Sequence, residues 1–300
     1  MVQDERYKNL LVNLSEESKI PFALTDLNFD LIHQPLGKTT DTFLVLVRND
    51  SQEHKFISKF FKSWHKREVK IYNEYLTETD LNTPEFYYGD DDVLIIEYLH
   101  EYKVIDESTR NIRNKLFDWQ VRKYRYFLNK LKDKQVDFDE HMVWMLKNPM
   151  QNFKKHSDLY DLEATLKIED KLISEFLSLK NSSLLCILDH NDLENQNILF
   201  NGKEIKIIDW ANSVHSLGMF DIAQFFKIYN EIGVFNKNYV QQFKVLTAID
   251  NIEELIMLFQ LIKEIMLLNY WLETDITASE INSSLLRLHK LAQAFRVCQQ

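Results

Sequence analysis

The segment from Leu188 to Leu199 contains residue types that suit phosphoryl transfer. It has a histidine, one intervening residue, an aspartate, four further residues and an asparagine, namely His190, Asp192 and Asn197. A carboxylate can orient an attacking hydroxyl and accept its proton, and an amide oxygen farther along the same loop can hold a magnesium ion near the phosphates. The spacing therefore predicts Asp192 as the catalytic base and Asn197 as a metal ligand.

A second carboxylate ends the apolar run Ile205–Ile208, at Asp209. The turn Asn201-Gly202 between this run and Ile198–Phe200 favours a tight hairpin. Because a hairpin returns the chain to its starting point, we expect Asp209 to lie beside Asn197. Asp209 is the second predicted metal ligand.

Two further residues are predicted to support the loop. Asp221 opens a predicted helix, where a buried carboxylate would accept hydrogen bonds from the backbone of the loop. His190 lies two residues before Asp192 and is expected to pack inward and organise the loop, not to act as a base.

The combined pattern resembles the aminoglycoside phosphotransferase and choline kinase superfamily, the small-molecule relatives of protein kinases. The His-Asn-Asp-Leu opening and the Phe-Asp-Ile-Ala ending are nearer to choline and ethanolamine kinases than to aminoglycoside kinases. The resemblance implies an α+β, two-lobed, protein-kinase-like fold with ATP, or GTP, and magnesium in its cleft. Two lobes are expected, an antiparallel-sheet lobe at 1–97 and a larger helical lobe at 98–300. A hinge at about 97–102 is expected to join them. The matched segments are His190-Asn191-Asp192 with Asn197, and Ile208-Asp209-Trp210 with Asp221-Ile222-Ala223.

The same resemblance implies a lysine that binds phosphate and a glutamate that holds it. Lys59 falls at the expected strand position, with Lys55 and Lys62 as competing choices. Glu68, on the following predicted helix, is its expected partner.

Other nucleotide contacts are implied by position in the first hundred residues. Gly37 lies in a segment that resembles the superfamily's nucleotide loop, although its single glycine departs from a Gly-rich pattern. The backbone of Glu97 and Leu99, at the end of an apolar run, is expected to bind the base.

The elements that must position these residues follow from apolar periodicity. Short β-branched and aromatic runs predict strands at 42–47, 55–61 and 93–98, with a helix at 66–75. After residue 101 the period near 3.6 predicts helices at 110–132, 158–179, 219–231, 251–274 and 278–297.

Composition limits the classes of partner that the protein is expected to bind. A formal charge of −10 argues against a nucleic-acid partner and would suit a cationic acceptor. The chain has two cysteines, a polar start and no apolar run long enough for a bilayer, so we expect a cytoplasmic protein without a membrane partner. The sequence does not specify the oligomeric state.

The acceptor is predicted to be a small hydroxylated molecule, with choline or ethanolamine first and an aminoglycoside as the alternative. Tyr229, Tyr270 and Trp271 are candidates for an aromatic acceptor pocket, and packing in the helical core is their other interpretation. A non-catalytic nucleotide-binding module is the alternative from another class. A protein kinase is disfavoured, because the eleven residues between Asp209 and Asp221 are too few for an activation segment.

Overall fold

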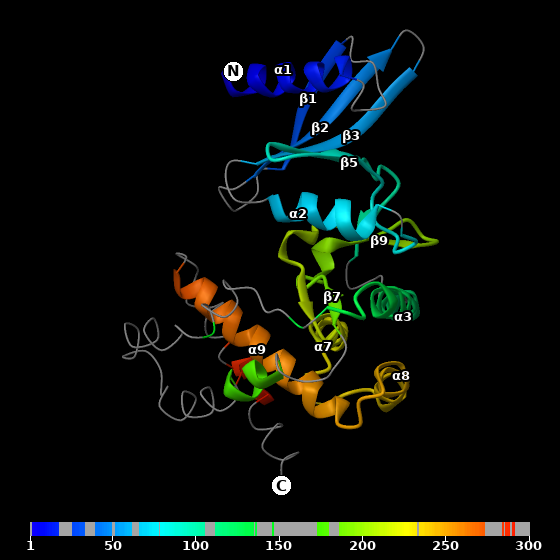
Figure 1. The fold of residues 1–300 in the computed structure, drawn as a ribbon, viewed down its shortest axis with the longest axis vertical. Helices are drawn as coiled ribbons and strands as arrows, with labels where there is room; N and C mark the ends of the chain where they lie inside the picture. The colour runs from blue at the N-terminus through cyan, green and yellow to red at the C-terminus, as the bar shows by residue number, and fades with distance from the viewer. Residues whose placement is uncertain are drawn as a thin grey trace. The chain divides into compact units, whose positions relative to one another are not determined.

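The chain of 300 residues folds into two compact units. The first unit is Met1–Asp106 with Asn195–Asn212, and the second is Glu107–Glu194 with Ser213–Gln300. The predicted lobe boundary at 97–102 stays a prediction. The computed structural model (Figure 1) describes residues 2–17, 26–33, 40–49, 52–61, 66–77, 79–105, 112–134, 136, 146, 173–179, 186–232, 234–273, 284, 286–288, 290 and 291.

The first unit contains a five-stranded antiparallel sheet in the order β1-β2-β3-β5-β4. The predicted strands correspond to β2, β3 and β5, whereas β1 and β4 were not predicted. The strands are β1 (Asp26–His33), β2 (Thr40–Asn49), β3 (Gln52–Phe61), β4 (Phe86–Gly89) and β5 (Val93–Glu97).

Helix α1 (Val2–Glu16) covers one face of this sheet. Leu11 and Leu14 of the helix share a buried apolar cluster with Val45 of β2 and with Phe56 and Phe60 of β3. Since side chains of a strand alternate between the two faces, Lys59 of β3 points to the face opposite Phe56 and Phe60.

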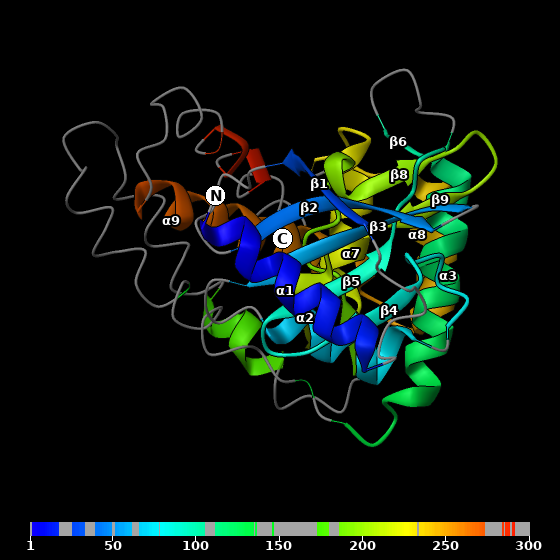
Figure 2. The ribbon, with the colours of Figure 1, turned by 90° about the horizontal axis from the view of Figure 1, so that it is seen from above.

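Helix α2 (Lys66–Ile71), continued by the π-helical turn η1 (Tyr72–Leu76), covers that opposite face (Figures 1 and 2). A Cβ atom added to Gly89 of β4 would lie 2.8 Å from Val69 of α2, so a glycine allows the helix to approach closely. Tyr72 stacks on Phe86 of β4 with ring centroids 5.7 Å apart. The helix that carries Glu68 is thereby packed against the strands beside Lys59.

A three-stranded sheet, in the order β6-β8-β9, completes the first unit. Its strands are β6 (Lys103–Val104), β8 (Ile198–Phe200) and β9 (Ile205–Ile207). The predicted hairpin is confirmed, because β8 and β9 pair antiparallel from Ile198 opposite Ile207 to Phe200 opposite Ile205. Single 3₁₀ turns flank it, η5 (Asn195–Asn197) before β8 and η6 (Trp210–Asn212) after β9.

The second unit is mainly helical, with β7 (Ile187–Asp189) paired antiparallel to β10 (Val214–Ser216). Three of its helices match predictions, and α8 was not predicted. The predicted helices at 158–179 and 278–297 lie largely outside the described residues. Residues 173–178, at the end of the first of these, are helical. The four long helices are α3 (Arg113–Lys130), α7 (Met219–Ile228), α8 (Lys237–Thr247) and α9 (Ile252–Glu273).

Aromatic packing joins α7 to α9 in the core of this unit. The rings of Phe220 and Phe259 meet edge to face with centroids 4.7 Å apart.

Asn236 caps α8 by accepting a hydrogen bond from the Asn238 N–H at 3.0 Å. None of the helices in the described residues is long and apolar enough to cross a membrane.

Candidate active site

The loop with the predicted base begins where β7 ends. Asn191 has a φ of 60°, in the left-handed region that asparagine tolerates better than most residues. His190 is fully buried, and its Nδ1 accepts a hydrogen bond from the Asp192 N–H at 3.2 Å. Leu193 is also fully buried, whereas Asp192 between these anchors is only partly buried. The loop therefore holds Asp192 on a backbone that is fixed at both sides.

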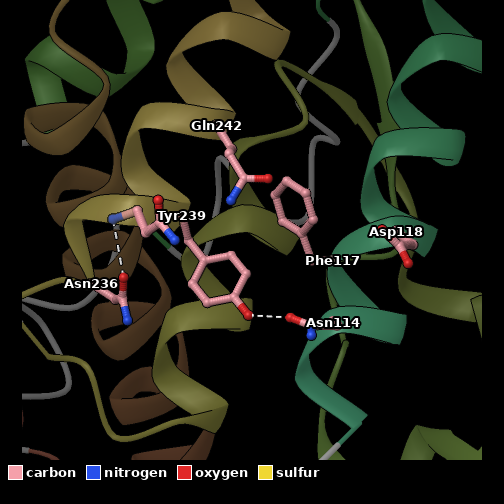
Figure 3. A pocket seen from close by; sticks show the side chains of 7 residues that line it. Asn114, Phe117, Asp118, Asn236, Tyr239 and Gln242 are labelled. Atoms are coloured by element: carbon pink, nitrogen blue, oxygen red, sulfur yellow. Dashed lines mark hydrogen bonds between the residues drawn. The ribbon is translucent and has the colours of Figure 1, made fainter.

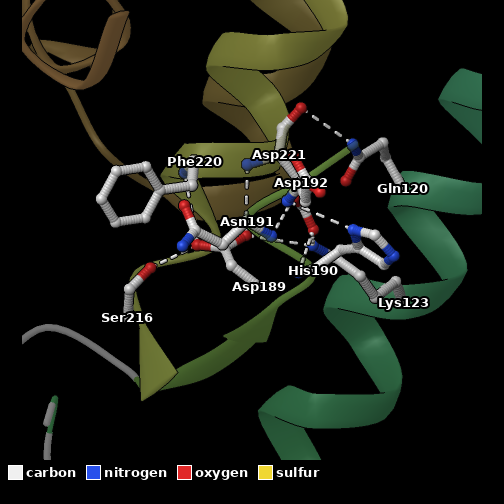
Figure 4. A network of polar contacts seen from close by, with 9 residues as sticks. All are labelled: Gln120, Lys123, Asp189, His190, Asn191, Asp192, Ser216, Phe220 and Asp221. Carbon is white, nitrogen blue, oxygen red and sulfur yellow. Dashed lines mark hydrogen bonds and ion pairs between the residues drawn. The ribbon is translucent and has the colours of Figure 1, made fainter. Parts of the chain in front are cut away.

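Asp221, in the first turn of α7, anchors the same loop. Its Oδ2 accepts a hydrogen bond from the His190 N–H at 2.7 Å, and its Oδ1 accepts one from the Asn191 N–H at 3.0 Å (Figure 4). Gly218 begins the helix with a φ of 78°, and a Cβ atom there would lie 3.0 Å from the ring of Tyr124. A glycine thus lets α7 start close to α3 and present Asp221 to the loop.

Asp189 forms a second anchor that sequence reasoning missed. It accepts hydrogen bonds from the Phe220 N–H at 3.2 Å, from the Asp221 N–H at 3.3 Å and from the Ser216 hydroxyl. Lys123 of α3 donates to Asp189 at 3.1 Å and also to Asp221. A lysine in the apolar stripe of the predicted helix 110–132 was the available signal, since buried lysines need partners.

One lysine thus bridges two buried carboxylates (Figure 4). Burial raises the pKa of Asp189 to about 6, because desolvation and the nearby Asp221 carboxylate outweigh the attraction of Lys123. Burial also opposes ionisation of Asp221, but Lys123 and the His190 N–H outweigh it and lower the pKa of Asp221. The carboxylate that holds the loop backbone is therefore the one that stays ionised.

In the first unit, Lys59 is the centre of an ion cluster. Its Nζ donates to both carboxylate oxygens of Glu68 at 2.9 Å and to Asp209 Oδ1 at 3.0 Å. Glu68 is 2% exposed and also accepts the Trp210 N–H at 3.3 Å. Of the competing lysines, Lys55 is exposed, and residue 62 lies outside the described residues.

The cluster keeps Lys59 charged. Burial alone would lower the pKa of its ammonium, but the carboxylates of Glu68 and Asp209 outweigh burial and raise the pKa above its ordinary value. A fixed positive charge of this kind can neutralise phosphate oxygens. Its role toward a nucleotide stays a prediction.

Asn197 and Asp209 lie at the same end of the β8–β9 hairpin. The Ile208 N–H donates to the Asn197 carbonyl at 3.0 Å, which places Asp209 one residue beyond the pairing. Asp209 has a φ of 65° and a side chain that is 45% exposed, whereas Asn197 is buried. One carboxylate and one amide oxygen fit a magnesium ion that takes its other ligands from phosphate and water. The described residues contain no group of three or more His, Cys, Asp or Glu side chains suited to a metal ion.

Comparison with known proteins gives matches only at the level of structure. No family model matches the sequence, and no curated protein matches it. The structure is similar to choline kinase from Cryptosporidium parvum, with a TM-score of 0.65 and 15% identity, covering 96% of this chain and 95% of that one. It is also similar to Plasmodium vivax ethanolamine kinase, with a TM-score of 0.63 and 17% identity, covering 97% and 87%. A third similar structure is the ternary complex of streptomycin and ATP with APH(2")-IIa, with a TM-score of 0.58 and 15% identity, covering 96% and 97%.

The chain has the two-lobed, kinase-like fold of these phosphotransferases. This confirms the α+β fold predicted from the sequence and, at the level of fold, the resemblance to the superfamily. At 15–17% identity the likeness concerns the fold, and the roles of individual residues stay predictions.

Residues predicted to bind the base of the nucleotide lie at the end of β5 in the kinase-like fold. The Glu97 N–H donates to the Glu85 carbonyl at 2.9 Å, and the Leu99 carbonyl accepts the Tyr102 N–H at 3.1 Å. The Glu97 side chain is held by Lys206 at 2.6 Å. The Glu97 N–H and the Leu99 carbonyl are therefore engaged within the protein. The predicted contact with the nucleotide base depends on the other backbone groups, the Glu97 carbonyl and the Leu99 N–H. Gly37, the predicted nucleotide-loop glycine, lies outside the described residues.

Among the three predicted acceptor aromatics, the structure describes the side-chain surroundings of Tyr229 alone. The guanidinium of Arg113 lies 4.6 Å from the Tyr229 ring centroid and 4.3 Å from that of Tyr239. Tyr229 thus already stacks on a cation of the protein itself, which agrees with the core-packing interpretation. Tyr270 and Trp271 belong to α9, but their side chains lie outside the described residues.

A pocket of about 500 Å³ lies between α3 and α8 (Figure 3). On its wall the Tyr239 hydroxyl donates to Asn114 Oδ1. None of the predicted site residues lines this pocket, so it is not part of the candidate active site.

Lys263 of α9 is a further residue that sequence reasoning did not assign to the site. Its Nζ donates to the Asn191 carbonyl and lies 3.3 Å from Asn191 Oδ1. The adjacent pair Lys263 and Glu264 interrupts the largely apolar stretch of α9 from Leu255 to Leu268, and charges among apolar side chains need partners. The interruption was visible in the sequence, but the identity of the partner was not.

Proposed function

We propose that the protein is a magnesium-dependent kinase that transfers the γ-phosphate of ATP, or GTP, to a hydroxyl group of a small molecule. The observation that supports this most is the ion cluster in which Glu68 and Asp209 hold Lys59, within a kinase-like fold. Burying these charges costs desolvation free energy unless each charge is paired. The pairing with Glu68 and Asp209 therefore keeps the Lys59 ammonium in one place and in its charged form. The likeness to an ATP complex supports the choice of nucleotide.

Each residue then has a separate task in the transfer. Asp192 accepts the proton of the acceptor hydroxyl while the hydroxyl oxygen forms a bond to the γ-phosphorus. The bond from that phosphorus to the oxygen that bridges the β- and γ-phosphates breaks, and this oxygen leaves with the nucleoside diphosphate. Asn197 and Asp209 would hold magnesium, which supplies positive charge for the phosphate oxygens. Lys59, kept in place by Glu68, neutralises phosphate charge as the nucleoside diphosphate leaves. His190 and Asp221 position the loop.

The proposed acceptor is a cationic alcohol, with choline or ethanolamine first and an aminoglycoside second. Its support is the formal charge of −10 and the structural likeness to a choline kinase and an ethanolamine kinase. Tyr229 stays a candidate for this site, although Arg113 already stacks on its ring. Tyr270 and Trp271 remain candidates, and the cytoplasmic location remains a prediction.

An assay of ADP or GDP release across a panel of acceptors tests the function. The panel contains choline, ethanolamine, streptomycin and a neutral polyol, each with ATP and with GTP, and Asp192→Asn serves as the inactive control. Turnover that depends on the acceptor and is absent in the control supports a kinase. Nucleotide binding without turnover on any acceptor would instead favour the non-catalytic nucleotide-binding module.

A further inference from the structure

Lys263 connects α9 to the loop that carries the predicted base. Its ammonium donates to the carbonyl of Asn191 and approaches Asn191 Oδ1 at 3.3 Å. The side chain is partly buried, in a helix whose neighbouring residues Ile262, Glu264 and Ile265 are buried. Lys263 is therefore directed at one residue of the loop and not at open solvent.

The contact falls on the residue of the loop with the most unusual backbone. Asn191 has a φ of 60°, a left-handed conformation that asparagine tolerates but that hydrogen bonds from its surroundings help to hold. Its N–H donates to Asp221 of α7 at 3.0 Å, and its carbonyl accepts from Lys263 of α9. Side chains of two helices thus hold the backbone N–H and the backbone carbonyl of Asn191. Asp192 is the next residue along the chain.

The positive charge of Lys263 also interacts with the carboxylates around Asp192. The groups that act on it electrostatically are Asp192 and Glu194 of the loop and Asp221 and Lys227 of α7. Three of these are carboxylates, so a cation at this position lowers the repulsion among negative charges gathered around the base.

We propose that Lys263 is a positioning residue that acts on Asp192 through Asn191. Its hydrogen bond fixes the left-handed turn, and its charge offsets the carboxylates around the loop. The catalytic part of this inference rests on the proposed kinase function, whereas the structural part does not.

The pH dependence of turnover supplies a readout that a purely structural role would not move. Burial lowers the pKa of Lys263, and the attraction of Asp192 and Glu194 only partly offsets burial. Lys263 should therefore lose its charge at a lower pH than an ordinary lysine, and turnover should fall with it. Arginine stays charged throughout this range, so Lys263→Arg should extend turnover to higher pH.

The experiment compares Lys263→Met and Lys263→Arg with Lys237→Met as the matched control. Lys237 of α8 also carries an ammonium that contacts α9, but it pairs with Glu253 at 2.7 Å instead of with the loop. For each variant, kcat, the KM of the nucleotide and the pH profile are measured. Amide hydrogen exchange is followed in the peptide that spans residues 187–194.

We expect Lys263→Met to lower kcat by about 100-fold, the effect of a small displacement of a reacting group, with the KM of the nucleotide unchanged. Exchange in the loop peptide should become faster. Lys263→Arg should recover most of kcat, and Lys237→Met should behave like the parent protein. If Lys263→Met does not fold, Lys263→Gln takes its place, because its amide keeps a donor without the charge.

The experiment distinguishes failure of the proposed kinase function from failure of the inference about Lys263. If the parent protein transfers phosphate to no acceptor, the proposed function fails, and the exchange measurement alone decides whether Lys263 holds the loop. Unchanged exchange in the loop of Lys263→Met overturns the inference in either case. Faster exchange with parental kcat and pH profile would overturn its catalytic part.

Discussion

At the scale of single residues, Asp192 is the group whose loss should separate binding from transfer. Asp192→Asn keeps the size of the side chain but removes the proton acceptor, so we expect kcat to fall by about 10²–10⁴-fold. Nucleotide affinity, measured by calorimetry, should stay near that of the parent protein. Asp118→Asn, which changes an exposed carboxylate on α3, is the control. Near-parental turnover of Asp192→Asn with the true acceptor would refute the catalytic assignment.

Asp209 and Asn197 should determine how nucleotide binding responds to magnesium. We expect affinity for ATP to rise when magnesium is added, and Asp209→Ala to lose most of this response because it lacks the exposed carboxylate of the pair. Asn197→Ala should weaken the response to a smaller extent. The comparison requires Kd values with magnesium and with a chelator. A parental response in Asp209→Ala would exclude Asp209 as a metal ligand.

At the scale of elements, the Lys123, Asp189 and Asp221 network ties α3, β7 and α7 together. The pKa of Asp189 is raised from its ordinary value of 3.8 to about 6 in the folded protein, chiefly by burial. The folded state therefore binds this proton more tightly than the unfolded chain does. The resulting contribution to stability is fully present below about pH 4 and is lost as the pH rises through about 6.

Replacing Asp189 with asparagine should remove this pH dependence. The free energy of unfolding of the parent protein, minus that of Asp189→Asn, should decrease between pH 4 and pH 7 in urea titrations. Asp118→Asn changes an exposed carboxylate on α3 and is the control. A difference that stays constant or grows over this range would contradict the raised pKa of Asp189.

At the scale of the whole molecule, the formal charge of −10 bears on the acceptor. If the acceptor is cationic, added salt should raise its KM, because salt screens attraction over distances of about 10 Å at 0.1 M. An aminoglycoside with several charges should respond more strongly than choline with one. Initial rates at several salt concentrations check this, with a neutral polyol as the reference. A KM that falls or stays constant as salt is added would argue against a cationic acceptor.

The sequence by itself determined the features that depend on short spacing along the chain. The loop from His190 to Asn197, the turn at Asn201-Gly202 and the return of the chain to Asp209 are local, because a hairpin register follows from its own turn and apolar pattern. Alternation along β3 puts Lys59 on the face opposite Phe56 and Phe60, but Lys55 shares that face, so the sequence did not choose between the two lysines. The fold followed from these local patterns together with the resemblance that they carry.

Only the tertiary structure decided which distant residues meet the loop. Lys123 pairs with Asp189 and Asp221, and Lys263 reaches Asn191, over separations of 66 to 98 residues along the chain. Packing of α3, α7 and α9 creates these contacts, and a helical period shows which face is apolar but not which partner that face meets. The same packing placed Arg113 over the ring of Tyr229. A buried charge in a sequence shows that a partner is required, whereas its identity depends on how the helices pack.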